Sequence, residues 1–276
     1  MLLRGIVVLF FLIACIPVIG QRTPTIKGNR NVVTINENLP PFHTIELQSN
    51  LDIYIAESAA HGYSLIADEN LVDILKFSVE DGVLVISSYY KIKSKKKLEI
   101  TIHYEALDAI RLHDGRLETK TQLKAYEQLE VHTFGFSKIE LQAKGSIINI
   151  RMADSSSGNF NVACDSLNFE AKDRVRASYY GNTDNQVVRL HRNAKVDAEG
   201  TTNQLEALLY ENSEFKATTL QSSAVSASLN DSATLSVWAT DSLMLSSKGS
   251  ARTFLYGDPK IEIREFLDTS QLIKKK

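Results

Sequence analysis

The sequence predicts an all-β protein: a right-handed, parallel, single-stranded β-helix (a β-solenoid) with coils of about 19 residues and more irregular strands at its N-terminal end. Three observations predict this fold. Similar segments recur along the second half of the chain, apolar residues alternate within each segment, and helical patterns are nearly absent. Alternating strands that end in a turn residue at a fixed interval are typical of β-solenoids.

The interval of the repeat follows from where its segments begin. The first begins at residue 129 and the last at residue 243, and 243 − 129 = 114, which is six steps of 19. Each segment opens on an aliphatic residue, and nearly all have Asp, Asn, Glu or Gly six places on. The seven segments are LEVHTFG (129–135), INIRMAD (148–154), LNFEAKD (167–173), VVRLHRN (187–193), LEALLYE (205–211), VSASLND (225–231) and LMLSSKG (243–249).

Each coil should contain three short strands and stack on the next coil about 4.8 Å away. A single coil cannot bury its apolar face, so stacking would create one continuous core. The opening positions predict an inward ladder of Leu129, Ile148, Leu167, Val187, Leu205, Val225 and Leu243. Ten and twelve places later comes a second inward set: Ile139/Leu141, Ala177/Tyr179, Phe215/Ala217 and Leu235/Val237.

Residues 1–20 have the pattern of a secretory signal peptide. A short basic start precedes an apolar run that is too short to span a membrane, and small residues lead to a cleavage site after Gly20. The alternative is lipoprotein processing at Cys15, which ends a lipobox-like Leu-Ile-Ala-Cys. Cleavage after Gly20 is favoured because apolar residues, rather than a polar tether, follow Cys15.

Three further segments follow the leader. Residues 21–41 contain three of the five prolines and predict an extended N-terminal arm, in which the apolar run 32–35 could pair with the body. Residues 42–262 form the β-helix domain. Residues 263–276 are a C-terminal tail that ends in three lysines and should fray.

The start of the body has less regular spacing than the repeats. Residues 70–76 (NLVDILK) are a short helical candidate. Glu80-Asp81-Gly82 predicts a tight hairpin turn between two alternating strands. Ile110 and Leu112 lie one repeat interval before Leu129 and Val131, which predicts that the repeat begins near residue 107.

Composition excludes several classes of protein. Removal of the leader takes away one of the 31 basic residues, Arg4, and leaves 30 against 33 acidic residues, a balance that argues against a nucleic-acid partner. After cleavage the chain has one cysteine, Cys164, so no internal disulfide can form. No other apolar stretch is long enough for a transmembrane segment.

Two stretches resemble a known family. The first, FHTIELQSNLDIYIAES…YSLIADENLVDILKFSVEDGVLVIS, contains an aromatic-x-x-Ile strand (Phe42, Ile45), an ADENL segment (67–71) and a hairpin from Val79 to Ile86. The second is SLMLSSKGSARTFLYGDPKI, with a Tyr-x-Gly-x-Pro-like end that reads Tyr-Gly-Asp-Pro (256–259). Together they resemble the GIN-type head domain of putative auto-transporter adhesins, secreted Bacteroidetes-type proteins, over about residues 42–262. The resemblance implies a right-handed β-helix and an adhesin-like role, and it brings no catalytic residues.

The residues six places into each repeat allow two interpretations. Asp, Asn and Gly suit turns because they accept unusual backbone angles and bond their own main chain. Stacked carboxylates could also form a calcium ladder, but no glycine-and-aspartate calcium repeat occurs. Turn chemistry is therefore favoured, and no metal or other cofactor is predicted. The row is Gly135, Asp154, Asp173, Asn193, Glu211, Asp231 and Gly249.

An outward row three places into the repeat begins with His113 and His132, followed by Arg151 and Glu170. The two histidines could share a metal ion or a proton if they lie in adjacent coils. Two histidines without a third ligand make a poor metal site, and mixed charges on a strand are usually a solvated surface. The second interpretation is favoured.

An enzyme of the polysaccharide lyase or hydrolase type is the alternative function. Glycoside hydrolysis needs two carboxyl groups across a cleft, one of them with a raised pKa. Asp154 with Asp173, or Glu118 with Glu140, could be neighbours, but such short coils leave no long loops to build a cleft. Cys164 shares a strand face with Phe160 and Val162 and predicts a buried structural thiol.

The densest charge run predicts the binding residues. Lys91, Lys93, Lys95, Lys96 and Lys97 precede a strand, where lysines can keep a loop soluble or bind an anionic glycan. Tyr89 and Tyr90 place one exposed aromatic ring beside them, and Tyr179 and Tyr180 do the same elsewhere.

These observations favour a non-catalytic, adhesin-like binding module of the cell envelope or extracellular space. Its partner would be a glycan, an envelope component or another protein. A structural spacer without a ligand is a third possibility. The protein would be exported through the inner membrane to the periplasm, the outer-membrane surface or the medium, and its oligomeric state stays open.

Overall fold

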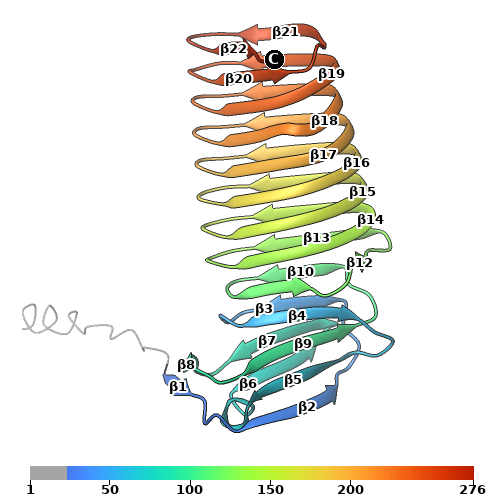
Figure 1. Cartoon of the computed structure of the whole chain (residues 1–276), viewed down its shortest axis with the longest axis vertical. Helices are drawn as coiled ribbons and strands as arrows, with labels where there is room; N and C mark the ends of the chain where they lie inside the picture. The colour runs from blue at the N-terminus through green and yellow to red at the C-terminus, as the bar shows by residue number, and fades with distance from the viewer. Residues whose placement is uncertain (1–23) are drawn as a thin grey trace, which may run out of the picture.

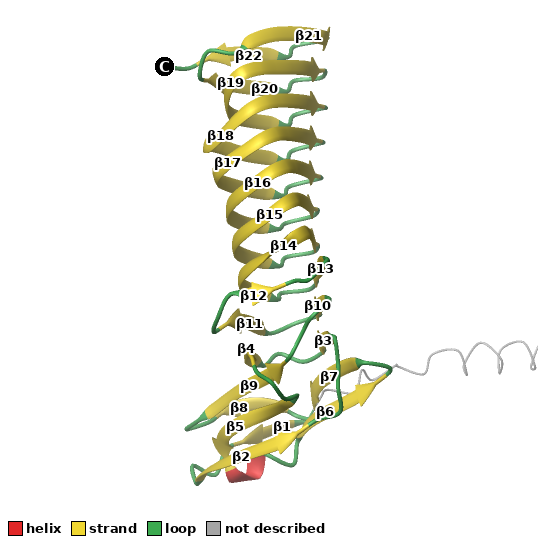
Figure 2. Cartoon of the chain, turned by 90° about the vertical axis from the view of Figure 1, so that its right-hand side faces the viewer, coloured by secondary structure: helices red, strands yellow, loops and turns green. Residues whose placement is uncertain are grey.

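The computed structural model of the chain describes residues 24–276, so the predicted signal peptide and Cys15 lie outside the described residues. The described residues form two parts (Figures 1 and 2). Irregular strands, joined by both parallel and antiparallel pairs, make up the N-terminal end, and a tall stack of parallel coils makes up the rest. This is the predicted all-β solenoid, with coils of the predicted length; its right-handed winding stays a prediction.

The N-terminal part contains β1 (Thr25–Lys27), β2 (Val32–Asn38), β3 (Thr44–Leu47), β4 (Asp52–Glu57), β5 (Gly62–Asp68), the 3₁₀ helix η1 (Glu69–Leu71), β6 (Leu75–Glu80), β7 (Val83–Ser88), β8 (Lys91–Ser94) and β9 (Leu98–Tyr104).

The stack contains β10 (Ala109–Leu112), β11 (Arg116–Thr119), β12 (Leu123–Lys124), β13 (Gln128–Thr133), β14 (Lys138–Met152), β15 (Ser157–Ala171), β16 (Arg176–Leu190), β17 (Lys195–Leu209), β18 (Glu214–Leu229), β19 (Thr234–Ser247), β20 (Arg252–Tyr256), β21 (Lys260–Phe266) and β22 (Gln271–Lys274).

A regular coil is one long bent strand followed by a tight turn, and the expectation of three short strands per coil is wrong. β15 runs for 15 residues, and its buried positions alternate until they break at Asp165–Ser166 and resume with Leu167. The backbone stays extended around this bend, so pairing with the next coil continues on both sides of it. Each coil therefore has a first face before the bend and a second face after it (Figure 2).

The core is a ladder of inward residues, and one rung differs from the prediction. Leu167 pairs with Gln186, which pairs with Leu205, so Gln186 takes the place expected for Val187. The fixed spacing of the coils overrides the apolar preference at this rung. Gln186 is 1% exposed, and its Oε1 accepts a hydrogen bond of 2.9 Å from the Tyr179 hydroxyl, which offsets part of the cost of burying an amide.

The first coil of the stack is longer than the others. Ile110 pairs with Val131, which lies two positions beyond the Leu129 that a regular coil would supply. The predicted register for Ile110 and Leu112 is therefore wrong. The loops around the short strand β12 contain the additional residues, and regular spacing begins at β13 and β14.

Antiparallel strands cover the N-terminal end of the stack. β3 and β4 pair in parallel with β10 and β11, while β2 pairs antiparallel with β5, and β5 with β9. The Glu80–Gly82 turn forms as predicted, with positive φ at Asp81 and Gly82. The helical candidate at 70–76 is reduced to η1, because Leu75, Phe77 and Val79 alternate and belong to β6, which pairs with β7.

The chain beyond residue 262 is ordered as strand, so the expected fraying is wrong. β21 pairs with the second half of β19, and β22 pairs with β20. Ile261 and Ile263 pair with Leu243 and Leu245 and extend the apolar rows by one coil, but their side chains are exposed.

The tight turns stack in a row, as the turn interpretation predicted. Each places one residue in the left-handed region: Gly135, Asp154, Asp173, Arg192, Glu211, Asp231, Gly249 and Asp268. Arg192 replaces the expected Asn193 because of the same one-residue shift that brings Gln186 inward. Several carboxylates in the row accept backbone N–H bonds from the preceding coil; Asp154 Oδ2 accepts from the Gly135 N–H at 2.9 Å. Hydrogen bonding within the protein therefore accounts for these acids.

Asp231 tests the importance of the left-handed turn. Its φ is 62° and its side chain is exposed. Asp231→Val should lower the free energy of unfolding by about 1–2 kcal/mol, because a β-branched residue is strained there. Asp231→Gly should be nearly neutral, since glycine adopts this conformation freely. Urea unfolding of both variants checks the prediction, and equal losses would contradict it.

Candidate binding surfaces

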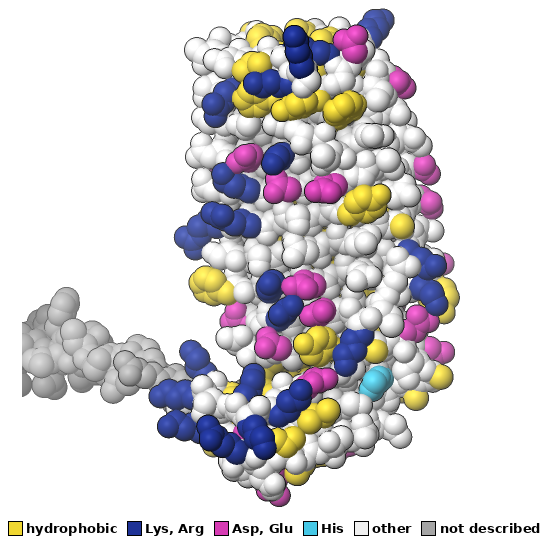
Figure 3. Space-filling view, viewed as in Figure 1, with side chains coloured by type: hydrophobic (Ala, Val, Ile, Leu, Met, Phe, Trp, Pro, Cys, Tyr) yellow, Lys and Arg dark blue, Asp and Glu magenta, His cyan; other side chains and the backbone are white. Residues whose placement is uncertain are grey.

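The predicted lysines form one exposed surface at the N-terminal end of the molecule. Lys91 and Lys93 lie on β8, and Lys95, Lys96 and Lys97 lie in the turn that follows; all five are exposed. β1 runs beside β8 and adds Lys27. In Figure 3, side chains of Lys and Arg gather at the lower end, where Figure 1 shows β8. We define the lysine–tyrosine surface as Tyr89, Tyr90, Lys91, Lys93, Lys95, Lys96 and Lys97.

A buried carboxylate fixes the shape of this loop. Asp68 is fully buried and accepts backbone N–H bonds from Lys96 at 3.0 Å, Lys97 at 3.1 Å and Arg30 at 3.2 Å. These bonds, led by the one from Lys96, hold the pKa of Asp68 below its usual range despite burial. Gly28 passes so close that a Cβ there would overlap Asp68 Oδ2. The lysines thus project from a fixed loop.

Most of the lysine charges are unpaired. Lys97 forms an ion pair of 2.8 Å with Glu99. Within residues 24–276, Lys91, Lys93, Lys95 and Lys96 form no ion pair with a protein carboxylate. Four cations held close together without acidic partners attract anions.

The tyrosines extend the lysine–tyrosine surface with aromatic rings. Tyr89 is 61% exposed and Tyr90 is 40% exposed. Tyr90 and Lys91 line a cavity of about 330 Å³, whereas Tyr89 and the other four lysines do not. Ser88 and Ile92 line it from the same stretch of chain. The other lining residues were not predicted, because they lie far away in the sequence: Gln48, Ser49, Asn50, Leu51 and Asp114.

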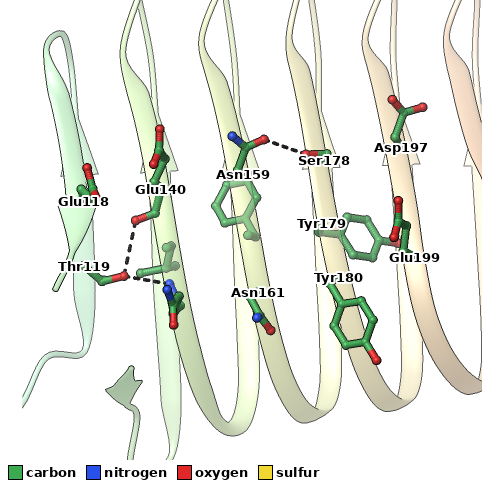
Figure 4. Close-up of a pocket in the computed structure, with 13 residues that line it drawn as sticks. Glu118, Thr119, Glu140, Asn159, Asn161, Ser178, Tyr179, Tyr180, Asp197 and Glu199 are labelled. Atoms are coloured by element: carbon green, nitrogen blue, oxygen red, sulfur yellow. Dashed lines mark hydrogen bonds between the residues drawn. The ribbon is translucent and has the colours of Figure 1, made fainter. Parts of the chain in front are cut away.

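A second hollow lies on the first face of the solenoid (Figure 4). It has a volume of about 380 Å³ and crosses β11 and β14 to β17. Tyr180 is 52% exposed beside it, while its neighbour Tyr179 is buried, as strand alternation predicts. The residues of this hollow lie too far apart in the sequence to be predicted as one site. Its remaining outward residues come from separate coils: Glu118, Glu140, Gln142, Asn159, Asn161, Ser178, Asp197 and Glu199.

The carboxylate pairs considered for catalysis are neighbours but serve other roles. Arg116 donates hydrogen bonds of 3.0 and 2.9 Å to Glu118 and Glu140 and so pairs with both carboxylates. In the other pair, Asp173 Oδ2 accepts a bond from the Asp154 N–H. Burial opposes ionisation of Asp173, but the hydrogen bond from Arg192 and further contacts outweigh it and lower its pKa. A glycosidase acid needs the opposite shift.

The two histidines do not form the predicted shared row. His132 lies opposite Arg111, and not His113, because of the longer first coil. His113 stacks on Phe134 with ring centroids 5.4 Å apart, and Phe134 also contacts His132 at 6.4 Å. Among the described residues, no group of three or more His, Cys, Asp or Glu side chains could hold a metal ion.

Cys164 is buried, as predicted. It is 9% exposed, and burial raises the pKa of its thiol to about 11. A thiol in this state is a poor nucleophile at neutral pH. The role that remains is packing between coils.

The chain matches a known protein family and several solved structures. A family model described as putative auto-transporter adhesin, head GIN domain, matches residues 41–259. No curated protein matches the chain. In the part of the chain that the structure describes, no helix is long and apolar enough to cross a membrane.

Solved structures share the fold. A putative lipid binding protein from Parabacteroides distasonis is 22% identical, with a TM-score of 0.63 over 91% of this chain and 100% of that one. A putative adhesin from Parabacteroides merdae is 15% identical, with a TM-score of 0.65 over 92% and 100%. A putative adhesin from P. distasonis is 14% identical, with a TM-score of 0.66 over 91% and 100%. At these identities the likeness concerns the fold alone.

Glu130 lies on the second face of the solenoid, and its hydrogen bonds should make the stability of the protein depend on pH. It accepts hydrogen bonds of 2.7 Å from both Asn149 and Arg151. Burial opposes its ionisation, but these contacts, with Gln128 and His132, outweigh burial and lower its pKa. Its stabilising effect is therefore complete above the unfolded pKa, about 4.3, and is lost as the pH falls through the lower folded value.

Glu130→Gln should therefore lower the free energy of unfolding by about 1.5–3 kcal/mol at pH 7, the scale for hydrogen bonds to a charged group. The difference from the unchanged protein should shrink towards pH 3. Urea unfolding at both pH values measures it, with Glu170→Gln as the control, since Glu170 lies 3.9 Å from Arg151 and is 46% exposed. A difference that grows at low pH would contradict the assignment.

Proposed function

The chain belongs to the family of putative auto-transporter adhesins with a head GIN domain, and on that premise we propose that it is a non-catalytic, adhesin-like binding module. It acts in the cell envelope or outside the cell. The lysine–tyrosine surface binds a ligand with phosphate, sulfate or carboxylate groups, either an anionic glycan or the headgroup of an envelope component.

The observation that carries this proposal is the fixed group of unpaired lysines. Asp68 holds the loop through backbone N–H groups, so its own charge is used inside the loop and the lysine side chains stay free. Because the loop is already ordered, binding costs less conformational entropy than it would for a flexible lysine tail. Exposed charges of this kind attract anions over about 8–10 Å at ordinary salt and lose that attraction at high salt.

The tyrosines add contact area next to the charges. Tyr90 shares its cavity with Lys91, Asn50, Ser49 and Asp114, so a ligand near Lys91 would have hydroxyl and amide partners, and one carboxylate, within the same hollow. A tyrosine ring offers an apolar face and a polar tip, which suits a ligand with both characters. A lipid-linked glycan of an envelope has both, and the P. distasonis relative described as a putative lipid binding protein supports including lipids among the ligands.

The alternative function is a carbohydrate-active enzyme on the same scaffold. The lowered pKa of Asp173 counts against it, because a glycosidase acid needs a raised pKa, and Arg116 already pairs with both Glu118 and Glu140. Cleavage of an oligosaccharide by the purified protein would favour the enzyme.

A glycan array with the protein from Gln21 onward, run with and without calcium, tests the proposal. Anionic glycans should be retained, and Lys93→Ala/Lys95→Ala/Lys96→Ala should weaken retention by about tenfold or more, which corresponds to ~1.4 kcal/mol. This triple variant keeps the Lys97–Glu99 ion pair and every backbone N–H that Asp68 binds. Phosphatidylglycerol vesicles provide the lipid arm.

The matched control is Lys144→Ala/Lys172→Ala/Lys248→Ala, which removes the same charge from exposed sites on the solenoid. It should bind like the unchanged protein. If both triple variants lost retention equally, the change in net charge alone would explain the loss, and a local binding site would be contradicted. No retention of any anionic glycan or vesicle would also contradict the proposal.

A further inference from the structure

The hollow on the first face has a chemistry different from that of the lysine–tyrosine surface. Two outward rows cross neighbouring coils there: Asn159, Ser178 and Asp197 in one, and Asn161, Tyr180 and Glu199 in the other. Because paired strands lie about 4.8 Å apart, the six side chains form a fixed grid. We call these six residues the amide groove (Figure 4).

The grid forms a hollow because its members differ in height. Asn159, Asn161 and Ser178 are short and make the floor, with the buried ring of Phe160 behind them. Tyr180 and Glu199 rise on one side, and Glu118 and Glu140 close the end towards β11. Each side chain projects from a strand that is paired on both sides, so the groove is already formed without a ligand.

Most polar groups of the groove have free hydrogen-bonding capacity. The Ser178 hydroxyl donates to Asn159 Oδ1 at 2.7 Å, which leaves the Asn159 NH₂ group free. Elsewhere in the groove, among the described residues, the side chains of Asn161, Tyr180, Asp197 and Glu199 make no hydrogen bond or ion pair with protein. The groove thus offers donors and acceptors close together, together with the face of an exposed ring.

The charges narrow the class of ligand. Arg116 compensates Glu118 and Glu140, and Lys216 lies opposite Asp197 in the next coil, but within residues 24–276 neither Asp197 nor Glu199 forms an ion pair. Carboxylates of this kind disfavour anionic ligands and accept hydrogen bonds from hydroxyl groups. Tyr, Asn and Ser together are the residues that form adaptable recognition surfaces, in which Tyr supplies rigid area and Asn and Ser supply hydrogen bonds.

We propose that the amide groove binds a neutral oligosaccharide that lies across the coils. The Tyr180 ring packs against the apolar face of one sugar. Asn159, Asn161 and Glu199 exchange hydrogen bonds with hydroxyl groups of that sugar and its neighbours. A chain of sugars that crosses the coils meets a polar side chain at each step of the grid. This site is independent of the lysine–tyrosine surface, which has the opposite charge and lies near β8 (Figure 1).

Isothermal titration with cellohexaose, chitohexaose, mannohexaose and xylohexaose tests the proposal on the protein from Gln21 onward. At least one should bind, and Tyr180→Ala should weaken it by about tenfold or more, the scale for truncating an aromatic residue at the centre of an interface. Tyr180→Phe keeps the ring and should retain most of the affinity. Thermal unfolding of each variant confirms that the fold is intact.

Two further variants separate this site from the lysine–tyrosine surface. Lys93→Ala/Lys95→Ala/Lys96→Ala should keep the affinity for the neutral hexasaccharide, whatever it does to anionic ligands. Asp197→Asn/Glu199→Gln should gain binding of hexagalacturonate in the groove, a gain that Tyr180→Ala removes. Failure of all four neutral hexasaccharides to bind, or equal binding by Tyr180→Ala and the unchanged protein, would overturn the proposal.

Discussion

Backbone pairing between successive coils is the constraint on which the rest of the structure depends. From β14 to β17 each paired residue lies opposite the one at the same place in the next coil, on both sides of the bend. Each coil buries its apolar face only against its neighbours, so the pairing fixes which side chains point inward. Gln186 shows how strong the constraint is: a buried amide enters the core ladder although valines stand at the next two positions, and the Tyr179 hydroxyl compensates it.

The same constraint explains what the sequence could predict. The repeat, most of the inward ladder and the row of turn residues follow from alternation and spacing, which are local properties. Pairing with other strands decides three features that these local properties do not predict: the rung at Gln186, the longer first coil and the strand that replaces a helix at Leu75. The amide groove could not be predicted, since its residues become neighbours only once the register is known. The lysines were visible as a run, but their fixation by Asp68 was not.

One scaffold thus presents two surfaces of opposite character. At the N-terminal end, four lysines without ion pairs follow two exposed tyrosines in the chain. On the first face, two carboxylates without ion pairs stand beside amides and Tyr180. Neither surface needs a long loop, because the coils place side chains in rows and a local change of one residue alters one point of the grid. This division suits an adhesin-like module that contacts different chemical groups at different heights.

Removal of one complete coil tests the central claim most directly. Residues 195–213 make up one coil, since Glu214 occupies in the next coil the place that Lys195 occupies in this one. A chain without residues 195–213 should give the same β-rich circular dichroism and one cooperative, somewhat less stable unfolding transition. A chain without residues 195–204, about half a coil, should not give this single cooperative transition, because the shortened coil could not pair in register with its neighbours and the stack would be interrupted there. Equal tolerance of both deletions, or unfolding of the first, would contradict the account.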